Sequence, residues 1–334
     1  MCGIAGYIGD RDCADVLIDA LSKLEYRGYD SAGIAVFENG TIKVEKCKGR
    51  LSNLVDKMKR DGKPEGHCGI GHTRWATHGE PSDINSHPHG NKRVSIVHNG
   101  IIENYKQLKD FLISEGYSFI SETDTETVAK LLDYYYDGNP LDTIAKVIGE
   151  IKGSYALGII FRDFPDTVYA VRKDSPLIVG SGEGENFIAS DVPAIIHYTR
   201  DYYLLDTNDI AVVKKDSIRF YDVHKNEIYK DINTADWDVD AAEKGGYEHF
   251  MLKEIHEQPT AVKTTITPRI QEHMPDFTAE GFDKDKLKSY NNIYIVACGT
   301  AMHAGMVGKY VIEKLVRVPV NVDIASEFRY RDPL

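Results

Sequence analysis

The chain has 334 residues and a formal net charge of −12, from 52 acidic and 40 basic side chains. A chain of this length is expected to form about two domains, and its negative charge disfavours binding to nucleic acids or anionic membranes. No apolar run reaches the roughly 18 residues of a membrane span, and no signal peptide is recognisable. Five cysteines without Cys-x-x-Cys spacing predict a reduced, cytoplasmic protein that holds no metal or cofactor.

Residues up to about 235 mix short strands with helices, which is typical of an α+β domain. Residues 3–9 and 31–49 are expected to be strands, the second range folding as a hairpin through Asn39–Gly40. After Gly153, short apolar segments separated by polar turns predict a mostly antiparallel sheet. Apolar residues at helical spacing, each run closed by a glycine, predict helices at residues 15–27, 103–115 and 125–137.

The composition changes near residues 236–247, which are acidic, contain glycines and have no periodic apolar face, so we expect a linker there. A helix is predicted at residues 249–266, with a kink or break at Pro259. Residues 292–328 have the pattern of one βαβ unit from a buried parallel sheet. Two strands do not complete such a sheet, so we expect the chain to be a fragment of a longer protein.

Cys2 directly follows the initiator methionine. It could simply be a small buried residue at the start of a strand. Removal of Met1 would instead leave one residue with a thiol of pKa ~8.5 and an α-amino group of pKa ~7.7–8.0. An amine of that pKa is a usable general base near neutral pH, so Cys2 could supply both a nucleophile and its base.

The densest polar cluster is GHTRWATHGEPSDINSHPH at residues 71–89. Such a loop is often merely solvated, and its histidines match no compact zinc-ligand spacing. Arg74 beside Trp75 is better suited to binding a carboxylate bidentately.

Two shorter stretches could complete a site for an amino-acid amide. Asn99–Gly100 could be only a turn after the strand at residues 93–97, but it could also supply two oxyanion donors. Asp124 could serve only the dipole at the start of its helix, or it could bind an ammonium group. With Cys2 and Arg74, these groups fit a substrate that has an α-carboxylate, an α-ammonium and a hydrolysable carbonyl group, as glutamine does.

Over almost its whole length the chain resembles the N-terminal-nucleophile glutamine amidotransferases, through MCGIAGYIG, YRGYDSAGIA, GHTRWATHG, HNGIIENY and SETDTE in that order. The resemblance implies a four-layer αββα sandwich (fold class α+β) for a glutaminase domain at residues 2–235, followed by a linker at 236–247. Residues 248–334 would be an interdomain helix and the beginning of a doubly wound α/β sugar-isomerase (SIS) domain. The tail motifs behind this last assignment are HFMLKEIHEQP, CGTAMHAG and ASEFRYR.

The resemblance also implies roles for individual residues. Cys2 would attack the side-chain amide of glutamine, and Asn99 and Gly100 would bind the oxyanion. Arg74 would bind the α-carboxylate of glutamine and Asp124 its α-ammonium group. The residues implied to shape the rest of the glutamine site are Trp75, Thr77 and His78.

Ammonia from glutamine would pass, in the complete and homodimeric enzyme, to fructose 6-phosphate, giving glucosamine 6-phosphate for amino-sugar biosynthesis. Thr300 would contact the sugar phosphate, with backbone N–H groups at a helix N-terminus. Ala301 stands where the family commonly has a serine, which removes one hydroxyl contact. The chain ends before the isomerase acid–base residues, so we expect this chain alone to be only a glutaminase.

Two other classes of function remain open on the sequence. Amidophosphoribosyltransferases and asparagine synthetases share the Cys-first glutaminase domain, although the βαβ unit with its CGT triplet argues against both. A non-catalytic sensor of sugar phosphates is the second alternative, but a sensor has no need of a cysteine at position 2.

Overall fold

The computed structural model describes residues 2–236 and 245–334, and the chain divides into two compact units, Met1–Phe250 and Met251–Leu334. Most of the linker predicted at residues 236–247 lies outside the described residues. Among the described residues, no helix combines the length and apolar character needed to cross a membrane.

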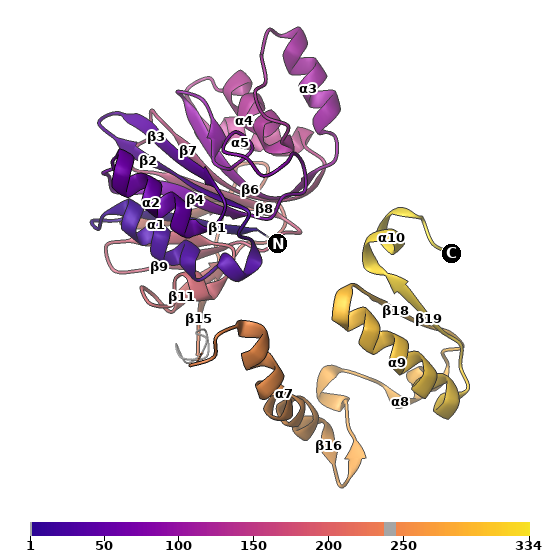
Figure 1. The fold of residues 1–334 in the computed structure, drawn as a ribbon. Helices are drawn as coiled ribbons and strands as arrows, with labels where there is room; N and C mark the ends of the chain where they lie inside the picture. The colour runs from indigo at the N-terminus through magenta and orange to yellow at the C-terminus, as the bar shows by residue number, and fades with distance from the viewer. Residues whose placement is uncertain (1, 237–244) are drawn as a thin grey trace. The chain divides into compact units, whose positions relative to one another are not determined.

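The first unit contains two antiparallel sheets (Figure 1). The eight-stranded sheet has the strand order β15-β11-β9-β10-β1-β4-β2-β3. Its strands are β1 (Gly3–Ile8), β2 (Ser31–Glu38), β3 (Thr41–Lys48), β4 (Cys68–Arg74), β9 (Ile178–Ser181), β10 (Asn186–Ala189), β11 (Asp201–Leu204) and β15 (Ile232–Thr234).

The seven-stranded sheet has the order β14-β13-β12-β8-β7-β6-β5. Its strands are β5 (His89–Gly90), β6 (Val94–Ile102), β7 (Gly153–Phe161), β8 (Val168–Lys173), β12 (Ile210–Lys214), β13 (Ser217–Tyr221) and β14 (Glu227–Ile228).

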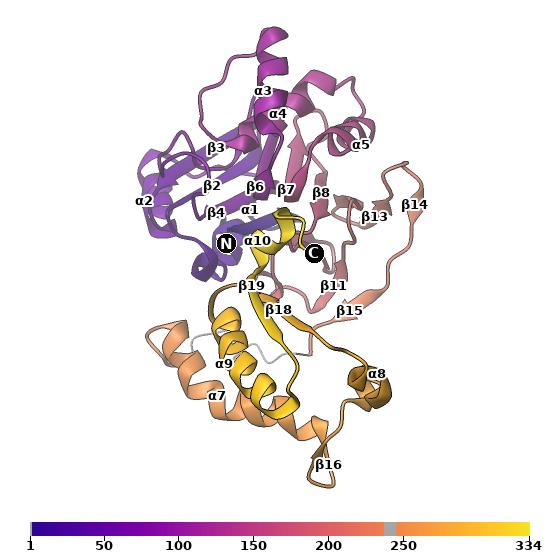
Figure 2. The same cartoon turned by 90° about the vertical axis from the view of Figure 1, so that its right-hand side faces the viewer.

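Helices cover the outer face of each sheet, so the unit has four layers in the order αββα (Figures 1 and 2). Helices α1 (Cys13–Ser22) and α2 (Leu51–Asp61) pack on the first sheet, and α4 (Asp124–Tyr135) packs on the second, flanked by α3 (Tyr105–Ser114) and α5 (Pro140–Glu150). A third apolar cluster, which includes Ile4, Ile70 and Val97, lies between the two sheets. This arrangement confirms the four-layer architecture expected from the sequence.

The sandwich explains why the central strands lack an alternating polar pattern. Every residue of β1 and of β4 is buried, because one face of each strand meets a helix and the other meets the second sheet. The strands are rich in glycine for the same reason. A Cβ atom added to Gly6 would lie 2.5 Å from the side chain of Ile188, so a larger residue would push neighbouring strands apart.

Three features of the first unit differ from the sequence-based expectations. The helix predicted to continue to residue 27 ends at Ser22, and Glu25–Arg27 form a separate 3-10 turn. Helices α2 and α5 were not predicted, although α2 buries Leu51, Leu54 and Met58 at helical spacing. The pair Asn99–Gly100 lies inside strand β6 rather than in a turn after it.

The second unit contains the predicted βαβ motif. Strands β18 (Ile293–Ala297) and β19 (Val320–Ile324) pair in parallel, and α9 (Gly299–Val316) connects them and packs on both. Helix α7 (Phe250–Ile266) precedes the motif and continues through Pro259, so of the predicted kink or break the break is wrong. The other elements are β16 (Ile270–Gln271), β17 (Met274–Pro275), α8 (Lys284–Lys288) and α10 (Ala325–Tyr330).

Because side chains pack between the two sheets, a cavity created there should greatly lower the free energy of unfolding. Ile70 is fully buried on β4, so Ile70→Ala should lower the free energy of unfolding by about 2–5 kcal/mol. Ile120 is 79% exposed, so the control Ile120→Ala should change the free energy of unfolding by no more than about 0.5 kcal/mol. Urea unfolding followed by far-UV circular dichroism measures both, and equal effects of the two variants would contradict the sandwich packing.

Candidate active site

One cavity of about 310 Å³ lies in the first unit, and all eight site residues predicted for the glutaminase domain line it. They come from separate parts of the chain: Cys2, Arg74, Trp75, Thr77, His78, Asn99, Gly100 and Asp124. The remaining predicted residue, Thr300, belongs to the second unit, where it is exposed in the first turn of α9.

The thiol of Cys2 lies against the backbone of Trp75. The Trp75 N–H donates to Sγ of Cys2 over 3.2 Å, and Sγ is 3.4 Å from the Trp75 carbonyl oxygen. Burial raises the pKa of the Cys2 thiol, and the hydrogen bond from Trp75 lowers it by a smaller amount. The resting group is therefore a thiol near neutral pH, and its use as a nucleophile requires a nearby base.

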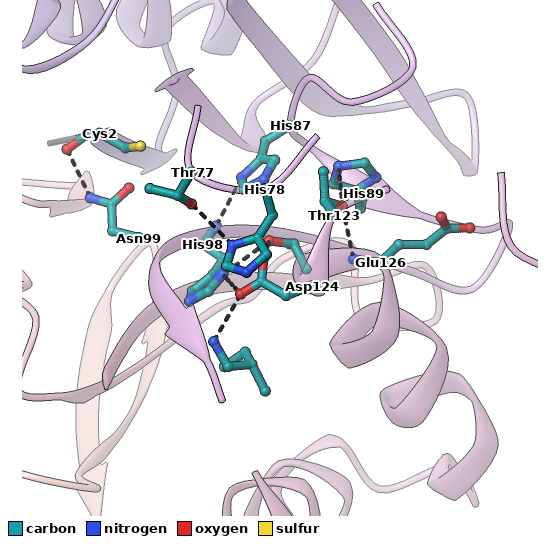
Figure 3. A network of polar contacts seen from close by, with 12 residues as sticks. Cys2, Thr77, His78, His87, His89, His98, Asn99, Thr123, Asp124 and Glu126 are labelled. Carbon is teal, nitrogen blue, oxygen red and sulfur yellow. Dashed lines mark hydrogen bonds and ion pairs between the residues drawn. The ribbon is translucent and has the colours of Figure 1, made fainter. Parts of the chain in front are cut away.

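Asn99 and Gly100 lie on strand β6, and both are beside Cys2. The amide Nδ2 of Asn99 donates to the carbonyl oxygen of Cys2 over 3.0 Å (Figure 3). Gly100 has φ of 129°, and a Cβ atom there would lie 2.0 Å from the carbonyl oxygen of Ser154. Only glycine fits this position, which keeps a backbone N–H next to the Asn99 amide at the cavity wall.

Arg74 ends strand β4 and is only 3% exposed. Its Nη2 donates to the carbonyl oxygens of His78 and Gly79, the second over 3.1 Å. Its Nη1 is buried and has no hydrogen-bond partner among the described residues. A buried guanidinium with a free donor is costly unless an anion completes it, so the cavity is suited to a carboxylate.

Asp124 is the first residue of α4 and is 4% exposed. Its Oδ2 accepts a hydrogen bond of 2.8 Å from the backbone N–H of Ile102. Its Oδ1 is 3.5 Å from the hydroxyl of Thr125, at the limit of a hydrogen bond. This oxygen therefore keeps accepting capacity for a cation in the cavity.

The loop after β4 covers the site. Asp30 accepts a hydrogen bond from the N–H of Ala76, and the ring of Trp75 packs edge-on against Tyr29 at 5.8 Å. Thr77 Oγ1 and His78 Nδ1 are 3.4 Å apart (Figure 3), and Trp75 is 51% exposed. The loop is thus held at its start, while its aromatic side chain stays open to solvent.

A family model described as a glutamine amidotransferase domain matches residues 72–197, which include Arg74, Asn99 and Asp124. These residues of the first unit therefore resemble a glutamine amidotransferase domain. Over its whole length it is 58% identical to a glutamine–fructose-6-phosphate aminotransferase (isomerizing) of Caldanaerobacter subterraneus and 56% identical to one of Clostridium tetani. The chain spans about half the length of these curated relatives, 55% in both cases.

Two solved structures share the fold of this chain. The allosteric regulatory enzyme of purine biosynthesis is 23% identical, with a TM-score of 0.60 over 67% of this chain and 50% of its own. The glutamine phosphoribosylpyrophosphate amidotransferase of B. subtilis is 19% identical, with a TM-score of 0.59 over 96% of this chain and 65% of its own. The two similarities show that these proteins share a fold with this chain.

The sequence analysis missed Arg27, which also lines the cavity that contains Cys2. Its Nη1 donates to the carbonyl oxygen of Ser190 and to Asp191, both over 3.2 Å. The sequence did contain a signal for Arg27, because this residue lies within the YRGYDSAGIA motif. Ser154, Ser175 and Pro176 line the cavity as well, but they belong to no motif that the sequence singled out.

Four buried histidines of the first unit, His72, His87, His89 and His98, form a row of neighbouring rings. The rings of His72 and His87 are 4.2 Å apart, and those of His87 and His89 are 5.0 Å apart. The ring of His98 also faces that of His87 (Figure 3 shows His87, His89 and His98). Burial lowers the pKa of all four, that of His72 to about 3. In residues 2–236 and 245–334, no group of three or more His, Cys, Asp or Glu side chains could hold a metal ion.

The buried histidines predict how stability depends on pH. Between pH 6.5 and pH 5 the unfolded chain takes up protons that the folded His72 does not, because its folded pKa is about 3. The free energy of unfolding should therefore fall as the pH falls, with His72 alone contributing a slope that rises toward about 1.4 kcal/mol per pH unit near pH 5. Carboxylates, with ordinary pKa values near ~4, contribute little in this window.

Denaturant unfolding at several pH values measures this dependence. His72→Gln removes the titrating ring but keeps an N–H donor, so its profile should be flatter by up to about 1.4 kcal/mol per pH unit near pH 5. Parallel profiles for the two proteins would show that His72 takes up its proton in the folded state.

Proposed function

We propose that the first unit hydrolyses L-glutamine to glutamate and ammonia, with Cys2 as the nucleophile. The observation that carries the proposal is the cavity itself. It combines a thiol, the Asn99 amide beside it, a buried guanidinium nitrogen that has no partner among the described residues, and a buried carboxylate with accepting capacity. These groups complement the side-chain amide, the α-carboxylate and the α-ammonium of one glutamine molecule.

The proposed reaction has two halves. Once Met1 has been removed, the free α-amino group of Cys2 takes the thiol proton while Sγ attacks the side-chain carbonyl carbon of glutamine. The N–H groups of Asn99 and Gly100 stabilise the tetrahedral oxyanion. The same proton then goes to the leaving nitrogen, ammonia departs and a thioester remains. Water, deprotonated by the α-amino group, hydrolyses the thioester to glutamate and regenerates the thiol.

We further propose that the longer protein to which this chain corresponds transfers the ammonia to fructose 6-phosphate, giving glucosamine 6-phosphate. The support is the name and identity of the curated relatives, together with the βαβ motif as the beginning of an SIS domain. In this proposal Thr300, at the start of α9, contacts the sugar phosphate. The domains are residues 2–235 and 248–334, and this chain alone is a glutaminase.

Two aspects of the longer enzyme are also part of the proposal. We place it in the cytoplasm because all five cysteines of this chain are free thiols, as expected in a reducing compartment. Its homodimeric state remains a prediction from the family resemblance.

Cys2→Ala should abolish glutamate release from L-glutamine while the melting temperature changes little, since the side chain is small and only partly buried. Cys2→Ser is the matched control for shape, and it should lose most activity because a hydroxyl is far less acidic than a thiol. Intact-mass measurement accompanies both assays. Substantial activity in a preparation that retains Met1 would rule out the α-amino group as the base.

Arg74 and Asp124 should act mainly on binding, because they contact the unreactive end of the substrate. Asp124→Asn keeps the size of the side chain but removes its charge, and it should raise KM by about 10-fold or more with a smaller loss of kcat. Wild type should also discriminate against glutamine that lacks its α-amino group, and the variant should narrow that preference. An unchanged preference ratio would mean that Asp124 serves only the start of α4.

A further inference from the structure

A buried histidine on the opposite sheet contacts the side-chain amide of Asn99. His72 lies on β4 of the eight-stranded sheet and is fully buried. Its Nε2 is 3.0 Å from the backbone carbonyl oxygen of His98 and 3.0 Å from Oδ1 of Asn99, both on β6 of the other sheet. These two contacts are the direct polar connection between His72 and the cavity wall.

The chemistry of the partners fixes which ring nitrogen of His72 carries the proton. A carbonyl oxygen can only accept, so Nε2 must be protonated and must donate to His98. The ring is neutral because burial lowers its pKa to about 3, so Nδ1 is unprotonated. Nδ1 is buried and has no partner in the part of the chain that the structure describes, which costs less for a bare nitrogen than for an N–H group in the same place.

The same N–H then selects one of the two orientations of the Asn99 amide. With Oδ1 toward His72, the NH₂ group points to the carbonyl oxygen of Cys2 and donates over 3.0 Å. The flipped amide would place two donors together at His72 and two acceptors together at Cys2. Because Nδ2 has two hydrogens and Cys2 takes one, the other remains for a ligand in the cavity.

We propose that His72 is a positioning residue, which acts through Asn99 by holding the amide with its NH₂ group toward the reacting carbonyl. The inference rests on the proposed glutaminase function, because it matters only if Asn99 donates to an oxyanion. His87 supports the arrangement, since its ring packs 4.2 Å from that of His72 and its Nδ1 accepts the N–H of His98 over 3.4 Å.

A double-mutant cycle on L-glutamine hydrolysis tests the inference in the full chain. Asn99→Ala should lower kcat by about 10²–10³-fold, the usual effect of one oxyanion donor. His72→Phe keeps a flat ring but removes the donor, and it should lower kcat by about 10- to 100-fold with KM within about threefold. In the Asn99→Ala background, His72→Phe should have no further effect beyond about twofold, because the residue through which it acts is gone.

Two further variants separate positioning from general disruption of the core. His72→Gln offers an N–H donor at a similar distance from the backbone, and it should restore kcat to within about tenfold of wild type. His89→Phe is the matched control, since His89 is equally buried in the row but hydrogen-bonds Thr123 over 3.1 Å rather than Asn99. Its effect should multiply with that of Asn99→Ala rather than disappear.

The outcomes distinguish this inference from the proposed function. If wild type releases no glutamate, the proposed function fails. If wild type is active and His72→Phe reduces kcat by equal factors in both backgrounds, or leaves kcat unchanged, only the role of His72 is overturned.

A measurement on unsubstituted protein covers the case in which His72→Phe does not fold. Nitrogen-15 NMR of the His72 ring should show a proton on Nε2 and none on Nδ1 across neutral pH. A proton on Nδ1 would overturn the inference.

Discussion

Gly3 pairs with Thr73 in the antiparallel ladder between β1 and β4, and the next residues along the two strands are Cys2 and Arg74. This register brings the first residues of the chain to the end of a central strand. The hydrogen bond from Trp75 to Sγ of Cys2 continues the contact beyond the ladder. A shift of one residue would send the side chain of Arg74 to the opposite face of the sheet, away from the cavity.

The hydrophobic core holds that register. Ile4 and Ile70 point into the space between the sheets, and a slipped strand would turn them toward the helix layer. Hydrogen bonds also connect the second sheet to the first, because Asn99 on β6 contacts both Cys2 and His72. The site therefore depends on how two sheets face each other, and a single strand or loop could not build it.

The sequence predicted which residues line the cavity better than it predicted the surrounding structure. Cys2 could be recognised from its position directly after Met1, Arg74 from its place beside Trp75 in a polar cluster, and Asp124 from its place at the start of a predicted helix. Asn99–Gly100 also belonged to a recognisable motif, but a local rule places Asn-Gly in a turn. Contacts with β7 override that rule, since Gly100 pairs with Tyr155 inside the sheet.

The elements that the sequence did not reveal depend on contacts between distant segments. Helix α1 ends at Ser22 because the following residues bend toward β4, where a Cβ atom on Gly28 would lie 2.8 Å from the backbone of Arg74. In the sequence, His72, His87 and His89 belonged only to a polar stretch, and nothing in their spacing indicated that their rings are buried together. Burial makes them neutral hydrogen-bonding groups, which the loop's polar composition alone did not suggest.

The backbone at Gly100 also limits how this protein can change over time or in the laboratory. Its φ of 129° and the carbonyl oxygen of Ser154 exclude every side chain, whatever reaction the cavity performs. Randomising residue 100 would yield no useful variants, because no compensating substitution can move the Ser154 carbonyl oxygen on the adjacent strand without breaking the sheet. Variation in substrate preference must instead enter through side chains around this fixed point, such as those of Ile101 and Ser175 on the cavity wall.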